Sequence, residues 1–322
     1  MQKLYTRWGK ELNKDLPLND YPRPQLRRNS FINLNGEWNY AIYDEYKKFA
    51  GYQGKITVPF SPECLLSGVE RMVEPTDVLY YQKIFDFKRT NHRVLLHFGA
   101  VDYECKVMLN NSFVGEHKGG YLPFTFDVTA YILDGENDLR VEVKDPTDTS
   151  YHARGKQTFK RGGIWYTPQS GIWQTVWLEE VCEGYIESIK LTPDIDADEL
   201  RVEINYNGKA TDEMAAIALD NGEVMAGTNL LTARALLSLR IMSAGVLKTR
   251  SFMTLRLLQV TIRLKATSVC VNSALVRTAR AHPVLCLTTS PISSMVFLTR
   301  AIGVTVCTPH LTMMPLYTIF RQ

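Results

Sequence analysis

The sequence predicts an all-β protein that contains a jelly-roll β-sandwich, followed by the first strands of a second sandwich. Short runs of alternating apolar and polar residues recur along the chain and are separated by turns rich in Gly and Asn. No segment of helix length shows a convincing helical period. Successive strands without crossover helices favour antiparallel sheets, and the 322 residues are enough for two domains.

The first predicted element is an extended arm at residues 1–25, which are polar and contain three prolines. We place the jelly roll at residues 26–182, with a first turn at Asn35 and Gly36. Residues 60–78 are expected to form a long loop, because they contain two prolines and mixed charges. The strands expected in this domain are 37–43, 55–59, 80–87, 92–98, 105–109, 113–115, 123–127, 139–143 and 172–178.

Two further features organise the predicted domains. Asn110 and Asn111 follow one predicted strand directly and predict a hairpin turn. Both faces of the strand at 172–178 are mostly apolar or aromatic, so we expect it to be covered on both sides. The second sandwich is expected to start at residues 183–228, with strands at 185–191, 200–206 and 215–219.

Charge divides the chain into two unlike parts. All 34 acidic residues lie at or before Glu223, whereas 11 of the 37 Lys and Arg residues lie after Asn229. The first part therefore has 26 basic against 34 acidic residues, a net charge of −8, and the last part has +11. Ordinary domains contain charges of both signs. The stretch 229–322 is foreign in composition to the rest.

Five motifs in the same order resemble the non-catalytic N-terminal half of family 2 glycoside hydrolases, the relatives of β-galactosidase, β-glucuronidase and β-mannosidase. They lie at 31–38, 97–103, 114–129, 141–148 and 170–179. The resemblance extends over about residues 25–228. It implies a jelly-roll sugar-binding domain of the galactose-binding type at 26–182 and the start of an immunoglobulin-like sandwich at 183–228.

The resemblance also implies a TIM barrel with two catalytic glutamates in the whole enzyme, a retaining hydrolase of O-glycosyl bonds in carbohydrate metabolism. A barrel alone takes about 250 residues, and the acid-free stretch 229–322 cannot supply the glutamates. We therefore expect this chain to be truncated, to hold no catalytic residue and to be inactive alone. The expected partners are carbohydrate and, in the whole enzyme, further copies of the same subunit.

The resemblance makes Asp145 the first candidate for a contact with sugar hydroxyls, because it follows a strand at the place of a pocket-facing aspartate in the family. The other candidates near the substrate are His152, Arg161, Trp165 and Tyr166. Four of the five have an alternative interpretation. Asp145 can be an Asp-Pro turn residue, and Arg161 can pair with Asp145 or Asp148 or bind the neighbouring domain. Trp165 and Tyr166 can pack against a neighbouring domain. The loop around Glu63 is also expected near the pocket, without a catalytic role.

Cofactors and membranes are not expected. The six cysteines form no CxxC pair and have no histidine at metal-ligand spacing, so we predict no metal site and no cofactor. No apolar run has the length of a signal peptide or a membrane span, which favours the cytoplasm. Two alternatives for function remain: a stand-alone carbohydrate-binding module, and a purely structural or assembly β-sandwich.

For residues 229–322 we hypothesise an out-of-frame or disordered tail. Codons for 299–307 can be chosen so that a reading one base earlier spells Asp-Gln-Gly-Tyr-Trp-Ser-Asp-Gly-Leu, which resembles the beginning of the family's barrel. The alternative is a basic arm for nucleic acid. Because the tail lacks Lys clusters, interleaved aromatic residues and any known motif, we expect no nucleic-acid partner.

The gene sequence tests this hypothesis. We expect that a single-base shift at about codon 229 gives a reading frame that encodes acidic, family-like sequence. The reason is that ordinary domains are about a quarter charged, with both signs present. The measurement is the nucleotide sequence across the codons of the tail. If no single-base shift there restores acidic residues, the tail is a genuine part of the protein.

Overall fold

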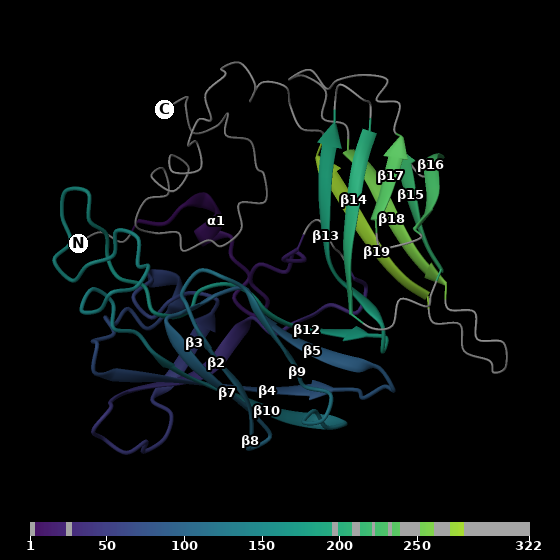
Figure 1. Cartoon of the computed structure of the whole chain (residues 1–322). Helices are drawn as coiled ribbons and strands as arrows, with labels where there is room; N and C mark the ends of the chain where they lie inside the picture. Colours follow the sequence, from purple (N-terminus) through teal and green to yellow (C-terminus); the bar gives the residue numbers. More distant parts are fainter. Residues whose placement is uncertain are drawn as a thin grey trace. The chain divides into compact units, whose positions relative to one another are not determined.

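The computed structural model describes residues 4–23, 28–194, 199–207, 213–220, 223–230, 234–238, 252–260 and 271–279. These residues fall into two compact units, each considered by itself. One unit holds the described residues of 4–22 and 32–179, and the other holds those of 23–31 and 180–293. Figure 1 shows the strands of both units.

The first unit is a sandwich of two antiparallel sheets (Figure 1). A four-stranded sheet has the order β1-β12-β5-β9, and a six-stranded sheet has the order β3-β2-β4-β10-β7-β8. A short third pair joins β11 to β6. This confirms the predicted jelly-roll sandwich. The strands are β1 (Ile32–Asn33), β2 (Gly36–Asp44), β3 (Gly54–Val58), β4 (Asp77–Phe87), β5 (Arg93–Phe98), β6 (Val101–Asp102), β7 (Glu104–Leu109), β8 (Ser112–Lys118), β9 (Phe124–Asp127), β10 (Gly135–Lys144), β11 (Gly171–Ile172) and β12 (Val176–Val181).

The core lies between the two sheets and follows from the alternation of the sequence. Along β10, buried and partly exposed residues alternate from Asn137 to Lys144, as the period of a strand requires. Trp38 is buried and donates from Nε1 to the carbonyl of Leu34 at 2.8 Å. Its ring meets Tyr81 edge-on, with the centroids 6.2 Å apart. The largest fully buried side chains are Trp38, Tyr81, Phe60, Phe98, Ile56, Leu79, Leu96, Leu109, Ile132, Leu139, Ile172 and Leu178.

The predicted hairpin turn between 105–109 and 113–115 is present. Asn110 and Asn111 have φ values of 52° and 64°. A two-residue hairpin turn with positive φ at both central positions matches the right-handed twist of its strands, and Asn tolerates that conformation better than most residues. The turn sets the register in which Leu109 lies opposite Ser112.

The structure corrects two expectations from the sequence. The predicted arm contains a short helix, α1 (Arg7–Lys10), whose N-cap Thr6 accepts a hydrogen bond from the amide of Gly9 at 3.1 Å. The strand expected at 172–178 is broken into β11 and β12. The chain changes partner there, from β6 to β1, and an unbroken alternation of residues does not reveal such a change.

The second unit contains two antiparallel sheets, in the orders β13-β14-β17 and β16-β15-β18-β19. Its strands are β13 (Tyr185–Asp194), β14 (Glu199–Asn207), β15 (Glu213–Asp220), β16 (Glu223–Leu230), β17 (Arg234–Ser238), β18 (Phe252–Val260) and β19 (Val271–Ala279). The three strands predicted here are present. β17, β18 and β19 lie within 229–322, where we expected disorder. The other residues of that stretch, apart from 229 and 230 in β16, lie outside the described residues, so the hypothesis of an out-of-frame or disordered tail stays a prediction.

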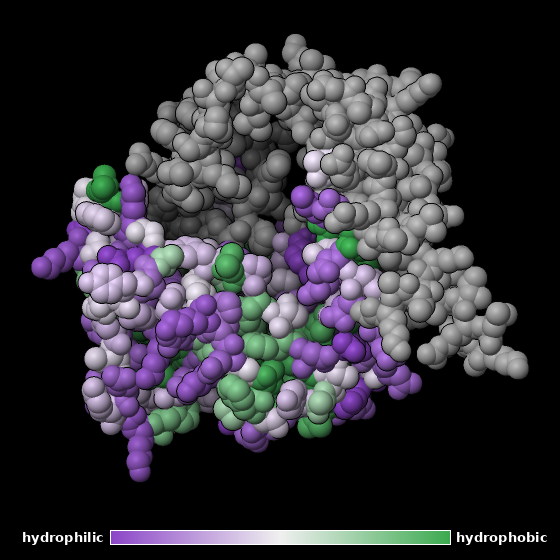
Figure 2. All heavy atoms as spheres, in the orientation of Figure 1, coloured by the Kyte–Doolittle hydropathy of each residue, from purple (hydrophilic) through white to green (hydrophobic). Residues whose placement is uncertain are grey.

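The visible surface of the first unit is mostly polar, as expected for a sandwich whose apolar residues lie in its core (Figure 2). The visible face of the first unit is mostly hydrophilic, with smaller hydrophobic areas between (Figure 2). Among the described residues, no helix is long and apolar enough to cross a membrane.

A pair of leucines tests the position of the core. Leu139 lies in β10 with no exposed surface, whereas Leu133 is 51% exposed. We expect Leu139→Ala to lower the free energy of unfolding by about 2–5 kcal/mol, because it removes buried methyl groups and leaves a cavity. Leu133→Ala, the matched control, should change it by less than about 0.5 kcal/mol. Urea denaturation of the full chain measures both, and equal losses would contradict the assigned core.

Candidate functional site

A cavity of about 420 Å³ lies within the first unit. It is bounded by the end of β6, by the turn that precedes β9, by the long segment between β10 and β11 and by Trp173, which directly follows β11. Its lining combines aromatic rings, side-chain amides, one carboxylate and two cations, a mixture that suits a small polar ligand with apolar faces. The lining residues are Asp102, Tyr121, Arg154, Gly155, Lys156, Gln157, Tyr166, Thr167, Gln169 and Trp173.

Asp102 is the buried carboxylate of this cavity and is only 3% exposed. Its Oδ2 accepts a hydrogen bond from Gln157 Nε2 at 3.1 Å, while its Oδ1 has no hydrogen-bond partner among the described residues. Burial, and secondarily the negative charge of Asp145, raise the pKa of Asp102 from 3.8 to about 7. A buried carboxylate oxygen without a hydrogen-bond partner is costly in free energy.

Gly120 allows the backbone to pass directly against Asp102. A Cβ atom at this position would collide with the carboxylate, so a larger residue would displace it. The carbonyl of Gly120 accepts a hydrogen bond from Trp173 Nε1 at 2.7 Å. One short stretch of backbone therefore positions both the carboxylate and the largest aromatic ring of the cavity.

Gln157 connects three sides of the cavity. Besides its bond to Asp102, its Nε2 lies 3.3 Å from the hydroxyl of Tyr121, and its Oε1 accepts from the amide of Gln169 at 2.6 Å. The segment around Gln157 is itself paired with Tyr166, which donates from its amide to the carbonyl of Lys156 at 2.9 Å. The amide side chain is therefore held in one orientation.

Aromatic rings form the apolar part of the lining. Tyr121 and Trp173 meet edge-on, with centroids 6.0 Å apart and planes at 74°. Tyr121 and Tyr166 are each 42% exposed. Partly exposed rings beside hydrogen-bonding groups can take the C–H face of a sugar while the polar groups take its hydroxyls.

Asp145, the first candidate from the sequence, is buried and hydrogen-bonded within its own turn. Its Oδ1 accepts from the amide of Thr147 at 2.7 Å, and its Oδ2 accepts from Ser170 Oγ at 2.7 Å. It is not one of the described residues that line the cavity. Its contact with sugar stays a prediction, and the bond from the Thr147 amide fits the alternative of a turn residue.

The structure brings one of the other four candidates, Tyr166, to the cavity lining. Trp165 is 48% exposed, and its amide and carbonyl pair with Gly162. Arg161 is exposed, and its guanidinium donates to Thr167 Oγ1 at 3.3 Å. The ring of His152 packs against Tyr103 with centroids 4.3 Å apart. A role near substrate stays a prediction for these residues.

Four residues of the cavity were not among the candidates from the sequence: Asp102, Tyr121, Gln157 and Trp173. A signal was present for three of them, because Asp102, Tyr121 and Trp173 lie inside the motifs at 97–103, 114–129 and 170–179 that carried the family resemblance. Gln157 lies outside these motifs. Its position becomes clear only when the chain is folded.

The first unit is a jelly-roll sandwich that holds this cavity. Residues 62–178 match the family model for the sugar binding domain of glycosyl hydrolases family 2. This match confirms, for this part of the chain, the resemblance found in the sequence.

Curated glycosidases are similar to the chain over part of their length. A β-galactosidase of Thermoanaerobacter pseudethanolicus is 29% identical over 204 residues, which are 60% of this chain and 26% of that protein. A putative β-glucuronidase of Formosa agariphila is 29% identical over 143 residues, which are 43% of this chain and 15% of that protein. The chain thus spans about a quarter or less of these relatives.

Solved structures confirm the β-sandwich fold. The apo β-glucuronidase of Ruminococcus gnavus has a TM-score of 0.62 at 15% identity, covering 80% of this chain and 47% of that one. The β-glucuronidase of Bifidobacterium dentium, complexed with coumarin-3-O-glucuronide, has a TM-score of 0.60 at 19% identity, covering 79% and 49%. The immunoglobulin-like assignment of the second unit stays a prediction.

The raised pKa of Asp102 predicts a pH-dependent stability. Because the pKa of about 7 in the folded chain exceeds the ordinary 3.8, the folded state binds this proton more tightly than the unfolded state. The contribution of Asp102 to stability is therefore present at low pH and lost as the pH rises toward 7. In Asp102→Asn we expect the loss of unfolding free energy between about pH 5 and about pH 8 to shrink by about 1–3 kcal/mol.

Urea denaturation at both pH values measures this effect. Asp86→Asn, which replaces an exposed aspartate of β4, is the matched control and should behave as the wild type. An unchanged pH dependence in Asp102→Asn would show that the carboxylate is not buried as described.

Proposed function

We propose that this chain is the sugar-binding part of a retaining family 2 glycoside hydrolase and that the cavity beside Asp102 takes one saccharide unit. The observation that carries the proposal is the cavity itself, where Asp102 lies with the rings of Tyr121, Tyr166 and Trp173. The Oδ1 atom of Asp102 is buried and has no hydrogen-bond partner among the described residues. The family match at residues 62–178 supports it.

The chemistry of the lining matches a sugar in two respects. Ionised Asp102 can only accept hydrogen bonds, and sugar hydroxyls can donate them. The amide of Gln157 adds a donor and an acceptor, and the ring of Trp173 offers an apolar surface. The volume of about 420 Å³ lies within the usual range of about 300–1,000 Å³ for small-ligand sites.

For the whole enzyme we propose hydrolysis of O-glycosyl bonds, as the names of the β-galactosidase and β-glucuronidase relatives suggest. Retaining hydrolysis needs two carboxylates about 5 Å apart, one as nucleophile and one as acid and base. We infer that both come from outside the described residues and that the 322-residue chain does not hydrolyse aryl β-glycosides by itself. A cytoplasmic, homo-oligomeric whole enzyme completes the proposal.

Titration with sugars tests the binding site. We expect the purified chain to bind at least one of galactose, glucuronate and mannose with a dissociation constant of about 1 mM or lower, measured by isothermal titration calorimetry. Asp102→Asn should weaken that affinity by about 10-fold or more, because it removes a charged hydrogen-bond acceptor. Protonation below the pKa of about 7 should weaken it in the same direction.

Asp86→Asn again serves as the control and should bind as the wild type does. If none of the three sugars saturates the chain, or if Asp102→Asn binds as tightly as the wild type, the cavity is not the proposed saccharide site. A structural or assembly role for the sandwich would then be favoured.

A further inference from the structure

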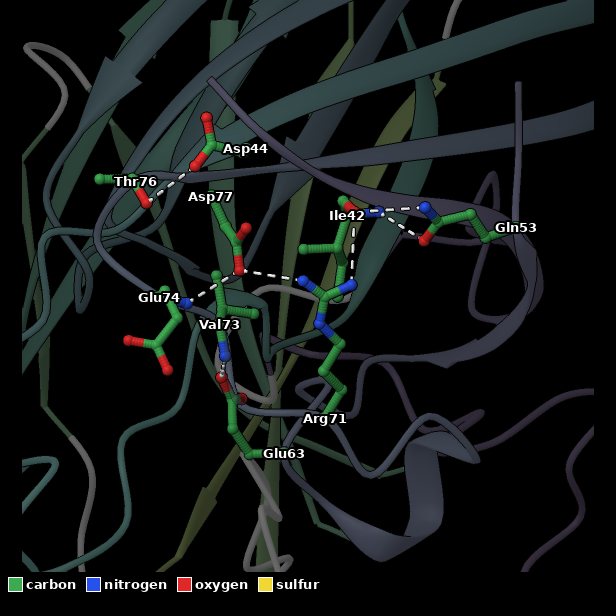
Figure 3. Close-up of polar contacts among 9 residues, drawn as sticks. All are labelled: Ile42, Asp44, Gln53, Glu63, Arg71, Val73, Glu74, Thr76 and Asp77. Atoms are coloured by element: carbon green, nitrogen blue, oxygen red, sulfur yellow. Dashed lines mark hydrogen bonds and ion pairs between the residues drawn. The ribbon is translucent and has the colours of Figure 1, made fainter. Parts of the chain in front are cut away.

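The loop between β3 and β4, residues 59–76, is fastened to the six-stranded sheet by a set of polar contacts (Figure 3). Arg71 donates from Nη2 to Asp77 Oδ2 at 3.2 Å and from Nη1 to the carbonyl of Ile42 in β2 at 3.3 Å. Asp77 Oδ2 also accepts from the amide of Glu74 at 3.0 Å. These hydrogen bonds hold the loop against strands β2 and β4 of the six-stranded sheet.

Glu63 joins this loop to the segment just before β11. Its Oε1 accepts from the amide of Val73 at 3.3 Å, as Figure 3 shows, and its Oε2 accepts from the amide of Ser170 at 3.1 Å. A single carboxylate thus holds two backbone N–H groups from distant parts of the chain. Each oxygen makes one of these bonds, so neither bond competes with the other.

The Glu63 carboxylate is buried, and burial raises its pKa from 4.5 to about 7. The titratable groups that face it are Tyr81, whose pKa is raised by burial and by the charge of Glu63, and Asp145, which it reaches through Ser170. Burying an ionisable group costs free energy that a neutral side chain would avoid. Ionisable groups whose pKa values are shifted by burial are frequent at functional sites.

Two separate sets of contacts connect residues 169 and 170, which lie at the point held by Glu63, to Asp102 in the cavity. Ser170 Oγ donates to Asp145 Oδ2 at 2.7 Å, and the charge of Asp145 contributes to the raised pKa of Asp102. The preceding amide, that of Gln169, donates to Gln157 Oε1 at 2.6 Å, and Gln157 Nε2 donates to Asp102 Oδ2 at 3.1 Å. Both sets of contacts end at the carboxylate of Asp102, whose Oδ1 has no hydrogen-bond partner among the described residues.

We propose that Glu63 is a positioning residue of the saccharide cavity: it fixes residues 169 and 170 against the loop and thereby sets the orientation and the electrostatic environment of Asp102. Glu63 itself does not line the cavity. The effect on ligand affinity rests on the proposed function, whereas the effect on the Asp102 carboxylate does not.

The proposal is tested with Glu63→Gln by two measurements. The first is a carbon-13 NMR titration of the Asp102 carboxyl group without ligand. We expect its midpoint to rise from about 7 by about half a unit or more, because a displaced Gln169 no longer holds Gln157 as a donor to the ionised form. The second is affinity for galactose, glucuronate and mannose, which should fall by about 10-fold for any sugar that the wild type binds.

Two controls separate positioning from general stability. Glu74→Gln replaces an exposed carboxylate of the same loop and should leave both measurements unchanged. In the Asp102→Asn background, Glu63→Gln should weaken affinity by less than about twofold, because residues of one network are not additive. If Glu63→Gln fails to fold, Glu63→Asp replaces it, with the same expected changes, since the shorter side chain cannot reach both amides.

The outcomes are distinguishable. A Glu63→Gln protein that melts earlier but keeps the wild-type titration of Asp102 and the wild-type affinity would overturn the positioning role and leave Glu63 as a structural residue. If the wild type binds none of the three sugars, the proposed function fails. The titration of Asp102 then still decides whether Glu63 positions it.

Discussion

Both the sandwich and the cavity depend on the close approach of Gly171 to Tyr81 and on the backbone conformation of Gly171. Its φ of 80° is a conformation that glycine adopts without strain, and a Cβ there would collide with the hydroxyl of Tyr81 in the core. The Tyr81 hydroxyl in turn accepts from the amide of Ile172 at 3.2 Å. Because β11 starts at this point, the same contact sets where Ser170 and Trp173 lie, so the packed core places the polar site.

The site contains two carboxylates, Asp102 and Glu63, whose burial costs free energy, and hydrogen bonds hold both of them in place. Asp102 and Glu63 both have pKa values raised to about 7 by burial, so each is poised between its charged and neutral forms near neutral pH. Their hydrogen-bond donors come from backbone amides and from Gln157, whose own orientation is fixed. In the proposed saccharide site, such fixed side chains would not have to be ordered when a ligand binds.

Local signals in the sequence predicted most of the strands and the Asn110–Asn111 hairpin, because alternation and turn chemistry act over a few residues. The site was less predictable. Tyr166 was anticipated, whereas Asp102 was missed because its burial depends on Gly120 and Gln157, which are distant in sequence. The break of the strand at 172–178 was missed for the same reason, since a change of strand partner is a tertiary event that leaves no mark on the alternation of residues.

The central claim is that a saccharide lies against Trp173 and Asp102. Nuclear Overhauser effects between sugar protons and aromatic protons of the chain test it most directly. We expect contacts from the C–H protons of bound galactose, glucuronate or mannose to the rings of Trp173 and Tyr121. Contacts confined to exposed rings outside the cavity, such as Trp165 or Trp8, would contradict it.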